Sequence, residues 1–144
     1  MPLATRLISS SVSIGCTGSM SELGCLSFYP TKNLGGFGEG GMILSTDVDR
    51  ANFCRRLRNH GQSQQYLHDV VGGNFRLDTL KAAILLVKLP HWEKFTQQRR
   101  ESASMYDALL KGAPVTTPYL APRNTHVYHQ YTIICDRRDE LMAF

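Results

Sequence analysis

Five of the seven residues from 35 to 41 are glycine, and this cluster limits what the surrounding chain can fold into. Its letters Gly36-Phe37-Gly38-Glu39-Gly40-Gly41 match the G-x-G-x-x-G pattern of dinucleotide-binding proteins. That fingerprint requires the third glycine to open a helix. Here Met42-Ile43-Leu44 follow, which is typical of a strand. We therefore reject nucleotide binding and expect tight turns, at which the backbone comes close to a ligand or to another chain segment.

Two strands and a helix are expected around this cluster. Residues 25–29 form a short β-type apolar run before it, and residues 41–45 form a second run after it. Thr46 is the predicted N-cap of a helix with acidic residues in its first turn. That helix is expected to continue to about Asn59 and to end at Gly61.

The middle of the chain predicts two more helices. Residues 62–76 are polar and rich in glutamine, so we interpret them as a connector. Apolar residues then recur at helical spacing from Leu77 to Leu110. Pro90 would interrupt a single helix, which predicts one helix over 78–89 and another over 90–111 with Pro90 in its first turn. The aromatic and methionine side chains of the second helix are expected in the core.

The C-terminal part is expected to be an extended linker followed by a strand. Gly112 ends the preceding helix, and three prolines mark residues 114–122 as the linker. The alternation of side-chain types over 128–135 predicts a final strand. Residues 136–141 predict the start of another helix. The whole pattern predicts a mixed α/β fold with two or three short strands and three helices.

The charge pattern argues against a nucleic-acid partner. The net charge is +4, but apart from the clusters at 55–58 and 99–100 the basic residues are scattered, and we interpret them as solvated helix faces.

No apolar run approaches the ~18 residues of a membrane-spanning helix, and the first 17 residues lack the basic start of a secretory signal. We expect a cytoplasmic protein that contacts no membrane.

The cysteines and histidines do not predict a metal site. The four cysteines show no C-x-x-C pairing, so reduced thiols are expected. His126 and His129 have an H-x-x-H spacing on extended chain, where ligands would point to opposite faces of a strand. A hydrogen-bonded surface or interface histidine is the better interpretation.

Lys32 follows the first apolar run and precedes the glycine cluster. A lysine that forms a Schiff base must attack a carbonyl as the neutral amine, and the end of a strand with few neighbouring charges suits that chemistry. From spacing alone, an ordinary exposed lysine is by far the better interpretation of this position.

A longer stretch changes that balance. Ser27-Phe28-Tyr29-Pro30-Thr31-Lys32-Asn33-Leu34-Gly35, followed by Gly38-Glu39-Gly40-Gly41, resembles the active-site lysine segment of the DegT/DnrJ/StrS-type sugar aminotransferases. Three later segments resemble that family in order, and together the resemblance covers residues 18–142: Leu57-Arg58-Asn59-His60-Gly61, Val71-Gly72-Gly73-Asn74-Phe75-Arg76-Leu77-Asp78 with Ala82-Ala83, and His126-Val127-Tyr128-His129-Gln130-Tyr131. The family's members are fold-type I enzymes that depend on pyridoxal phosphate and aminate keto-sugars attached to nucleotides.

The resemblance implies roles for five residues. Lys32 would be the catalytic residue that bonds covalently to pyridoxal phosphate, and Ser27 would hydrogen-bond the cofactor phosphate. Asn74 would reach the phosphate in the other subunit, because the family's active site is shared across a dimer. His126 and His129 would lie near the sugar-nucleotide pocket. No metal ligand is implied.

The resemblance also implies that the chain is partial. The family's phosphate loop and its Asp-Ala-Ala-Gln segment lie upstream of what is present, and an ungapped placement puts Ser9 and Val12 where that Asp and Gln belong. The Asp pairs with the cofactor's ring nitrogen and makes the ring an electron sink. We expect a poorly ordered segment at 1–17, a late large-domain segment at 18–112, and a linker with the start of the small domain at 113–144.

Two functions follow from the resemblance. The chain is either a truncated aminotransferase acting on nucleotide-linked keto-sugars, inactive alone, or a non-catalytic relic that serves as a binding or assembly module. Binding of pyridoxal phosphate is expected to be weak or non-specific, with Lys32 an ordinary solvated lysine. In both cases a homo-oligomer, most simply a dimer, is expected, because apolar helix faces left in water favour association.

Overall fold

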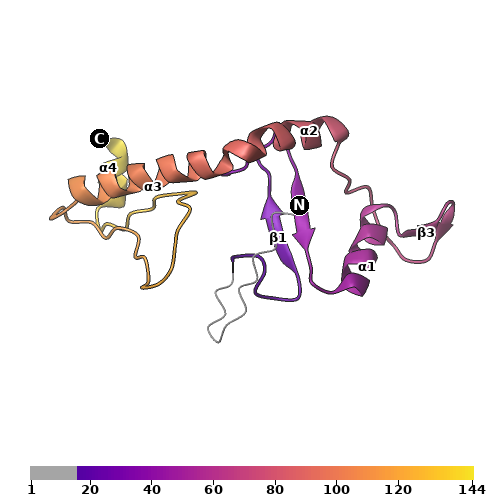
Figure 1. The fold of residues 1–144 in the computed structure, drawn as a ribbon. Helices are drawn as coiled ribbons and strands as arrows, with labels where there is room; N and C mark the ends of the chain where they lie inside the picture. Colours follow the sequence, from indigo (N-terminus) through magenta and orange to yellow (C-terminus); the bar gives the residue numbers. More distant parts are fainter. Residues whose placement is uncertain (1–15) are drawn as a thin grey trace. The chain divides into compact units, whose positions relative to one another are not determined.

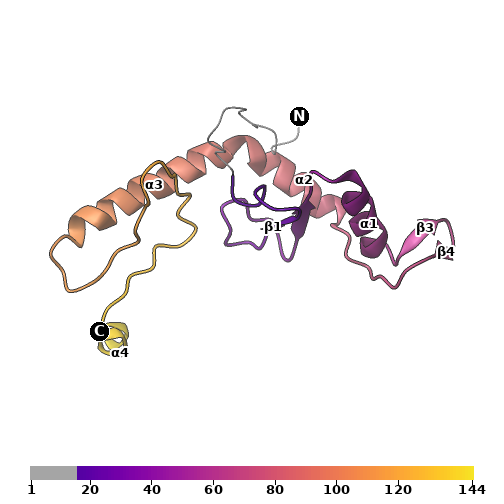
Figure 2. The same cartoon turned by 90° about the horizontal axis from the view of Figure 1, so that it is seen from below.

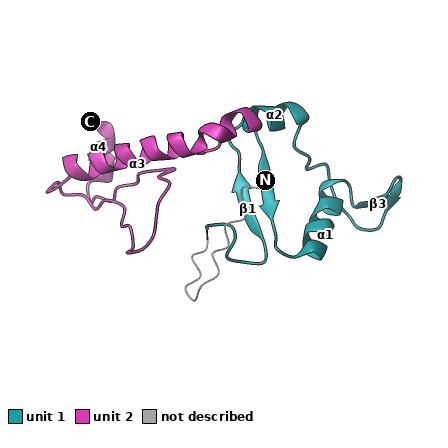
Figure 3. Ribbon diagram, viewed as in Figure 1, with its two compact units in different colours: residues 1–30, 35–85 teal, residues 31–34, 86–144 magenta. Residues whose placement is uncertain are grey.

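The computed structural model describes residues 16–144. The expected weak order at 1–17, and the placement of Ser9 and Val12, concern residues that lie almost wholly outside this range. The described chain divides into two compact units (Figure 3). Unit 1 comprises residues 16–30 and 35–85, and unit 2 comprises residues 31–34 and 86–144. Each combines helix or short strand with long connections, and the predicted mixed α/β fold is confirmed.

Unit 1 contains the two strands that flank the glycine cluster. Strands β1 (Gly24–Ser27) and β2 (Gly41–Leu44) pair antiparallel, with Cys25 opposite Ile43 (Figure 1). Both strands were predicted from their apolar runs. The third glycine of the G-x-G-x-x-G letters therefore opens a strand and not a helix, which confirms that the glycines serve a turn.

The connection between β1 and β2 is closed by the backbone of Phe28. Its N–H donates to the carbonyl of Gly40 at 2.8 Å, and its carbonyl accepts from the N–H of Gly36 at 2.7 Å. A Cβ on Gly35 would lie 2.2 Å from the carbonyl oxygen of Pro30, so only glycine fits there. Phe28 is one of three buried apolar residues in the described chain, with Leu85 and Ala103. The two hydrogen bonds of the Phe28 backbone therefore hold together the two ends of the loop that carries Lys32.

Helix α1 (Val48–Arg58) begins one residue later than predicted. The N-cap is Asp47 and not Thr46, because the Asp47 carboxylate accepts from the N–H groups of Asp49 and Arg50 at 2.9 and 3.1 Å. A carboxylate also interacts favourably with the positive end of the helix dipole. These bonds, first among them that from Arg50, hold the pKa of Asp47 below its usual range.

The chain after α1 turns back on the helix end. Gly61 adopts φ +70°, and a Cβ there would lie 1.7 Å from the carbonyl oxygen of Val70. The last helical carbonyls, of Leu57 and Arg58, accept from the N–H groups of Gly73 and Phe75, each at 3.0 Å. These bonds satisfy the open C-terminal end of the helix, and they fix the position of the residue between the two donors.

A short hairpin lies where a featureless connector was expected. Strands β3 (Gln62–Gln64) and β4 (Leu67–His68) pair antiparallel across a turn in which Tyr66 adopts φ 65° (Figure 2). The prediction missed it because a glutamine-rich run shows none of the apolar alternation that marks a half-buried strand.

Pro90 divides the long helical region as predicted. Helix α2 (Thr79–Lys88) is followed by the single 3₁₀ turn η1 (Leu89–His91), which contains Pro90, and then by α3 (Trp92–Leu109). Gly112, at φ +84°, follows the helix end. A proline is tolerated at a helix start because the N–H it lacks has no partner there.

One stripe of α3 holds the C-terminal segment of unit 2. Thr96 and Ala103 are buried on α3, and at matching helical spacing lie Arg99, Arg100 and Asp107. Arg100 donates from Nε to the carbonyl of His126 at 3.1 Å, and the hydroxyl of Tyr131 donates to Asp107 at 2.5 Å. The packed stripe is therefore small and polar, not the aromatic and methionine face that was predicted. Met105 and Leu109 are 65% and 77% exposed.

The predicted strand over 128–135 is wrong. Only an isolated bridge between Thr116 and Ile134 forms there, and Tyr128 adopts φ 43°, which no strand residue can keep. Tyr128 instead donates its N–H to Nδ1 of His126 at 2.9 Å. Helix α4 (Arg138–Ala143) confirms the helix predicted after this segment. Within residues 16–144, the structure contains no helix of the length and apolarity needed to cross a membrane.

Two glycines with positive φ allow a matched test of this packing. Gly61→Ala should destabilise the chain by roughly 3 kcal/mol, since it adds a clash to the strain of a left-handed alanine. Gly112→Ala should cost only ~1 kcal/mol, because a Cβ there meets nothing within 4 Å. Urea unfolding followed by circular dichroism measures both. Equal losses for the two variants would contradict the close approach of Gly61 to Val70.

Candidate functional site

Lys32 lies at the tip of the closed loop and is half-buried. Its Nζ is 3.2 Å from Nε2 of His129, a residue 97 positions later in the chain. The neighbouring Asn33 donates from Nδ2 to the carbonyl of Val127 at 2.7 Å. The expectation of an ordinary solvated lysine is therefore wrong, because two successive loop residues bond to the segment 127–129.

The ring of His129 lies between two cations. Burial, then the Lys32 ammonium and then the Arg99 guanidinium lower the pKa of His129 below the ordinary value of a histidine. At neutral pH the ring is therefore uncharged, with one nitrogen that accepts and one that donates. Nε2 contacts Lys32, while Nδ1 is buried and has no hydrogen-bond partner among the residues that the structure describes.

Arg99 fixes the backbone that carries this ring. Its Nη1 donates to the carbonyls of Tyr128 and His129, both at 3.2 Å. The sequence placed Arg99 and Arg100 on a solvated helix face, yet both are half-buried and bind main-chain oxygens. An arginine can satisfy two carbonyls with one side chain, so a basic pair on a helix can hold a loop and not only face water.

Ser27, the predicted phosphate ligand, ends β1 and is exposed. Its Oγ accepts from the N–H of Tyr29 at 3.3 Å. That bond uses a lone pair of the oxygen, so the hydroxyl hydrogen is left to donate to an external acceptor. The orientation suits an anionic oxygen such as that of a phosphate.

Asn74, the second predicted phosphate ligand, follows the β3–β4 hairpin and pairs with Asn59 in an isolated bridge. Its Oδ1 accepts from Nε of Arg76 at 3.0 Å, and Nη1 of the same guanidinium donates to Oδ1 of Asn59 at 3.0 Å. Because the amide oxygen of Asn74 is taken, its NH₂ group is the part left to donate. Arg76 thus orients Asn74 as a hydrogen-bond donor.

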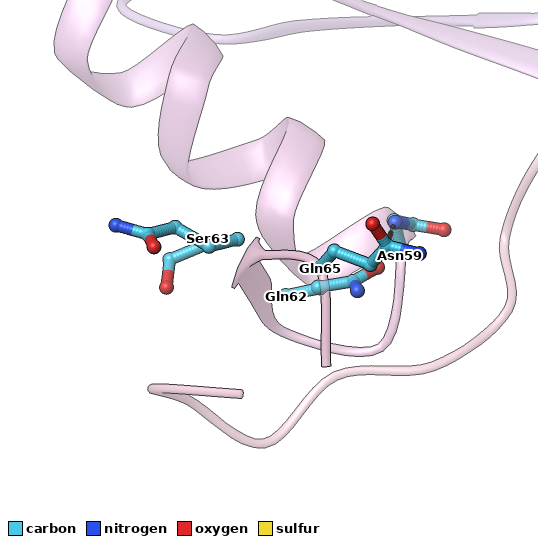
Figure 4. Close-up of a pocket in the computed structure, with 5 residues that line it drawn as sticks. Asn59, Gln62, Ser63 and Gln65 are labelled. Atoms are coloured by element: carbon cyan, nitrogen blue, oxygen red, sulfur yellow. Dashed lines mark hydrogen bonds between the residues drawn. The ribbon is translucent and has the colours of Figure 1, made fainter. Parts of the chain in front are cut away.

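An open polar hollow of about 320 Å³ lies beside this network in unit 1 (Figure 4). Its lining is Asn59, Gln62, Ser63, Gln64 and Gln65. Asn59 donates from Nδ2 to Oε1 of Gln62 at 2.9 Å. Arg76 bonds both Asn59 and Asn74, so the lining of the hollow is connected to Asn74. The lining carries hydroxyl and amide groups but no ionisable side chain.

His126 is exposed and contacts Tyr128, two residues along its own segment. Its ring stacks on Tyr128 with centroids 4.6 Å apart, and its Nδ1 accepts from the Tyr128 N–H. Within unit 2, the structure brings Lys32 and His129 together. In residues 16–144 no group of three or more His, Cys, Asp or Glu side chains could hold a metal ion.

Comparison with known proteins decides the family. Residues 9–144 match the model of the DegT/DnrJ/EryC1/StrS aminotransferase family. The chain belongs to this family. The match includes Ser27 at the end of β1, Lys32, Asn74 and the segment 126–131, and therefore all five predicted site residues.

Two curated relatives are similar to most of this chain, but they match it over only part of their own length. A protein of Geobacillus stearothermophilus called pleiotropic regulatory protein is 48% identical over 132 residues, which cover 90% of this chain and 36% of the relative. The UDP-N-acetyl-3-dehydro-alpha-D-glucosamine 3-aminotransferase of Acidithiobacillus ferrooxidans is 43% identical over 122 residues, covering 85% of this chain and 33% of the relative. The chain spans about a third of the length of these relatives.

Solved structures agree with this assignment. The S. venezuelae DesV structure, in complex with a ketimine intermediate, is 40% identical with a TM-score of 0.82, over 88% of this chain and 34% of that one. NtdA of Bacillus subtilis, with bound cofactor PMP, is 27% identical with a TM-score of 0.72, over 85% and 29% of the two chains. PMP is the amine form of pyridoxal phosphate, so members of the family use a cofactor of that type.

The residues present fit part of such a cofactor. Lys32 supplies an amine in a half-buried position, and Ser27 and Asn74 each carry a donor oriented away from its own internal bond. A neutral imidazole beside the amine adds no competing charge. The sequence did not predict the supporting roles of Arg76 and Arg99. Arg76 lies in a segment that resembles the family, and Arg99 lies in a basic pair that was interpreted as a solvated helix face.

The lowered pKa of His129 has a consequence for stability. Because the unfolded chain protonates this histidine at a higher pH than the folded chain does, the stability it contributes is full above about pH 6.5 and falls as the pH drops toward the folded pKa. We expect the urea midpoint to drop more steeply between about pH 7.5 and about pH 5.5 in the wild type than in His129→Gln. Parallel curves for the two proteins would contradict the burial of a neutral His129.

Proposed function

We propose that this chain is the cofactor-lysine part of an aminotransferase that depends on pyridoxal phosphate and acts on nucleotide-linked keto-sugars. The observation that carries the proposal is the half-buried Lys32 amine, held 3.2 Å from the imidazole of His129. Support comes from family membership and from relatives whose names describe nucleotide-sugar aminotransferases. Because the chain spans about a third of those relatives, the 144 residues alone are proposed to bind the cofactor weakly and to lack turnover.

Each site residue has a role in this proposal. Lys32 is the attachment point and moves a proton at its Nζ, Ser27 donates to the cofactor phosphate, and Asn74 donates to the phosphate in a neighbouring subunit. His126, exposed beside Tyr128, contacts the sugar nucleotide. When bound, the cofactor would supply an electron sink for negative charge that develops on the substrate carbon. The ring-nitrogen carboxylate that this chemistry requires is not provided by Ser9 in the ungapped placement.

Selective chemical trapping tests this proposal. The 144-residue chain is incubated with pyridoxal phosphate, reduced with borohydride and mapped by peptide mass spectrometry. We expect Lys32 to be labelled ahead of the other four lysines, which are Lys81, Lys88, Lys94 and Lys111. The reason is that its amine is half-buried and held in place by the contact with His129.

Two variants give the controls for that experiment. Lys32→Ala should remove the selective label, and Lys94→Ala should leave it unchanged. Labelling of all five lysines in proportion to their exposure would refute the cofactor role of Lys32. That outcome would favour the second candidate, a non-catalytic module.

Uncovered apolar surface supports a homo-oligomer, which is expected for both candidate functions. On α2, Leu80 and Val87 are 81% and 72% exposed and lie seven positions apart, which places them on one face of the helix. Leaving such a face in water costs ~25 cal/mol per Å² of apolar area. We propose that the chain covers this face by self-association into a homo-oligomer, most simply a dimer.

Light scattering coupled to size-exclusion chromatography tests the assembly. We expect the wild type to be larger than its 16.1 kDa monomer, and the double variant Leu80→Gln/Val87→Gln to shift to the monomer. Thr79→Ser, on the same helix, is the matched control and should keep the wild-type mass. A wild type that stays monomeric at high concentration would rule out this assembly.

A further inference from the structure

The amine of Lys32 and the ring of His129 are held from both sides by other bonds. On the lysine side, Asn33 donates to the carbonyl of Val127 at 2.7 Å, which keeps the loop tip against the segment 127–129. On the histidine side, Arg99 donates to the carbonyls of Tyr128 and His129. The contact between Nζ and Nε2 therefore does not depend on two flexible side chains meeting by chance.

The backbone of the segment is bent for this contact. Tyr128 adopts φ 43°, a left-handed conformation that costs a tyrosine of order 1–3 kcal/mol. The bonds from Arg99 to the two carbonyls, and the bond from the Tyr128 N–H to His126, compensate that cost. A left-handed residue directly before His129 changes the direction of its side chain from that in a regular strand.

The protonation state allows one direction for the hydrogen bond at neutral pH. Burial and the two nearby cations keep the imidazole neutral, so its Nε2 can accept from the Lys32 amine while Nδ1 carries the ring proton. A protonated imidazole would instead repel the ammonium. In the described chain the groups that face this ring are the amine of Lys32 and the guanidinium of Arg99.

We propose that His129 is a positioning residue for Lys32: its Nε2 holds the lysine amine, and Arg99 holds the backbone that aims the imidazole. The significance of this pairing for cofactor attachment rests on the proposed function, whereas the pairing itself does not. The role differs from sugar-nucleotide contact, which the family resemblance implied for His129, because the ring faces the amine and its Nδ1 is buried.

Trapping with pyridoxal phosphate and borohydride in the full 144-residue chain measures the effect on Lys32. In His129→Ala the initial rate of Lys32 labelling should fall about fivefold, the size expected for loss of one hydrogen bond. His129→Gln should recover most of that loss, because the glutamine side chain can place an amide group near the position of Nε2. His91→Gln, a histidine of η1 in the same unit, is the control and should leave the rate unchanged.

A second measurement needs no cofactor and no variant at His129. Nitrogen-15 NMR of labelled histidine should show His129 as a neutral ring with the proton on Nδ1 and a hydrogen-bonded Nε2. Lys32→Met should move the Nε2 resonance and raise the pKa of His129, because a cation and a donor are removed. Lys94→Met should do neither.

The outcomes separate this inference from the proposed function. If the wild type shows no preference for Lys32 but the NMR coupling is present, the proposed function fails and the pairing stands. If Lys32 is labelled selectively and equally well in His129→Ala, the positioning role is refuted. If the chemical shift of Nε2 is the same in Lys32→Met as in the wild type, the pairing itself is refuted. This test holds even where His129→Ala does not fold.

Discussion

Both main-chain groups of Phe28 are bound by the glycine cluster, and the arrangement of the lysine loop follows from that pairing. The N–H reaches Gly40 and the carbonyl reaches Gly36, so residues 29–35 form a loop of fixed length at the end of β1. Gly35 approaches Pro30 so closely that a side chain there would collide with its carbonyl oxygen. The glycines thus set the length of the loop that carries Lys32.

The second constraint is the polar stripe of α3. Thr96 and Ala103 let the chain lie close to the helix, and Arg99 and Arg100 bind the carbonyls of residues 126, 128 and 129. These carbonyls belong to the segment for which a strand was predicted, and side-chain donors bind them in place of a neighbouring strand. As a result, the ring of His129 has a fixed direction, and the amine of Lys32 has a neutral partner and not a charged one.

Local features of this structure could be predicted from the sequence, and contacts between distant residues could not. The two strands beside the glycines, the break at Pro90 and the helix end at Gly61 depend on neighbouring residues, and they were found. The β3–β4 hairpin was not predicted because its strands are polar. The prediction of a strand over 128–135 was wrong because an alternating pattern does not reveal that Tyr128 adopts a left-handed conformation. Thr46 and Asp47 are both good N-caps, and the choice between them depends on backbone geometry.

The candidate site shows the same division. The family resemblance singled out Lys32, Ser27 and Asn74, but their hydrogen-bond directions needed the structure. Arg76 orients the amide of Asn74 and Arg99 fixes His129, and neither role could be inferred from spacing, since the partners lie on different elements. The contact between Lys32 and His129 joins residues 97 positions apart, which no local pattern encodes.

The central claim is that Lys32, held by the loop and by His129, is the residue that binds the cofactor. The most direct measurement is an absorbance titration of pyridoxal phosphate with the 144-residue chain and with Lys32→Ala. The account predicts a shifted cofactor band that grows with the wild type, saturates at one cofactor per chain and is absent from the variant. The same band at the same intensity in both proteins would contradict it.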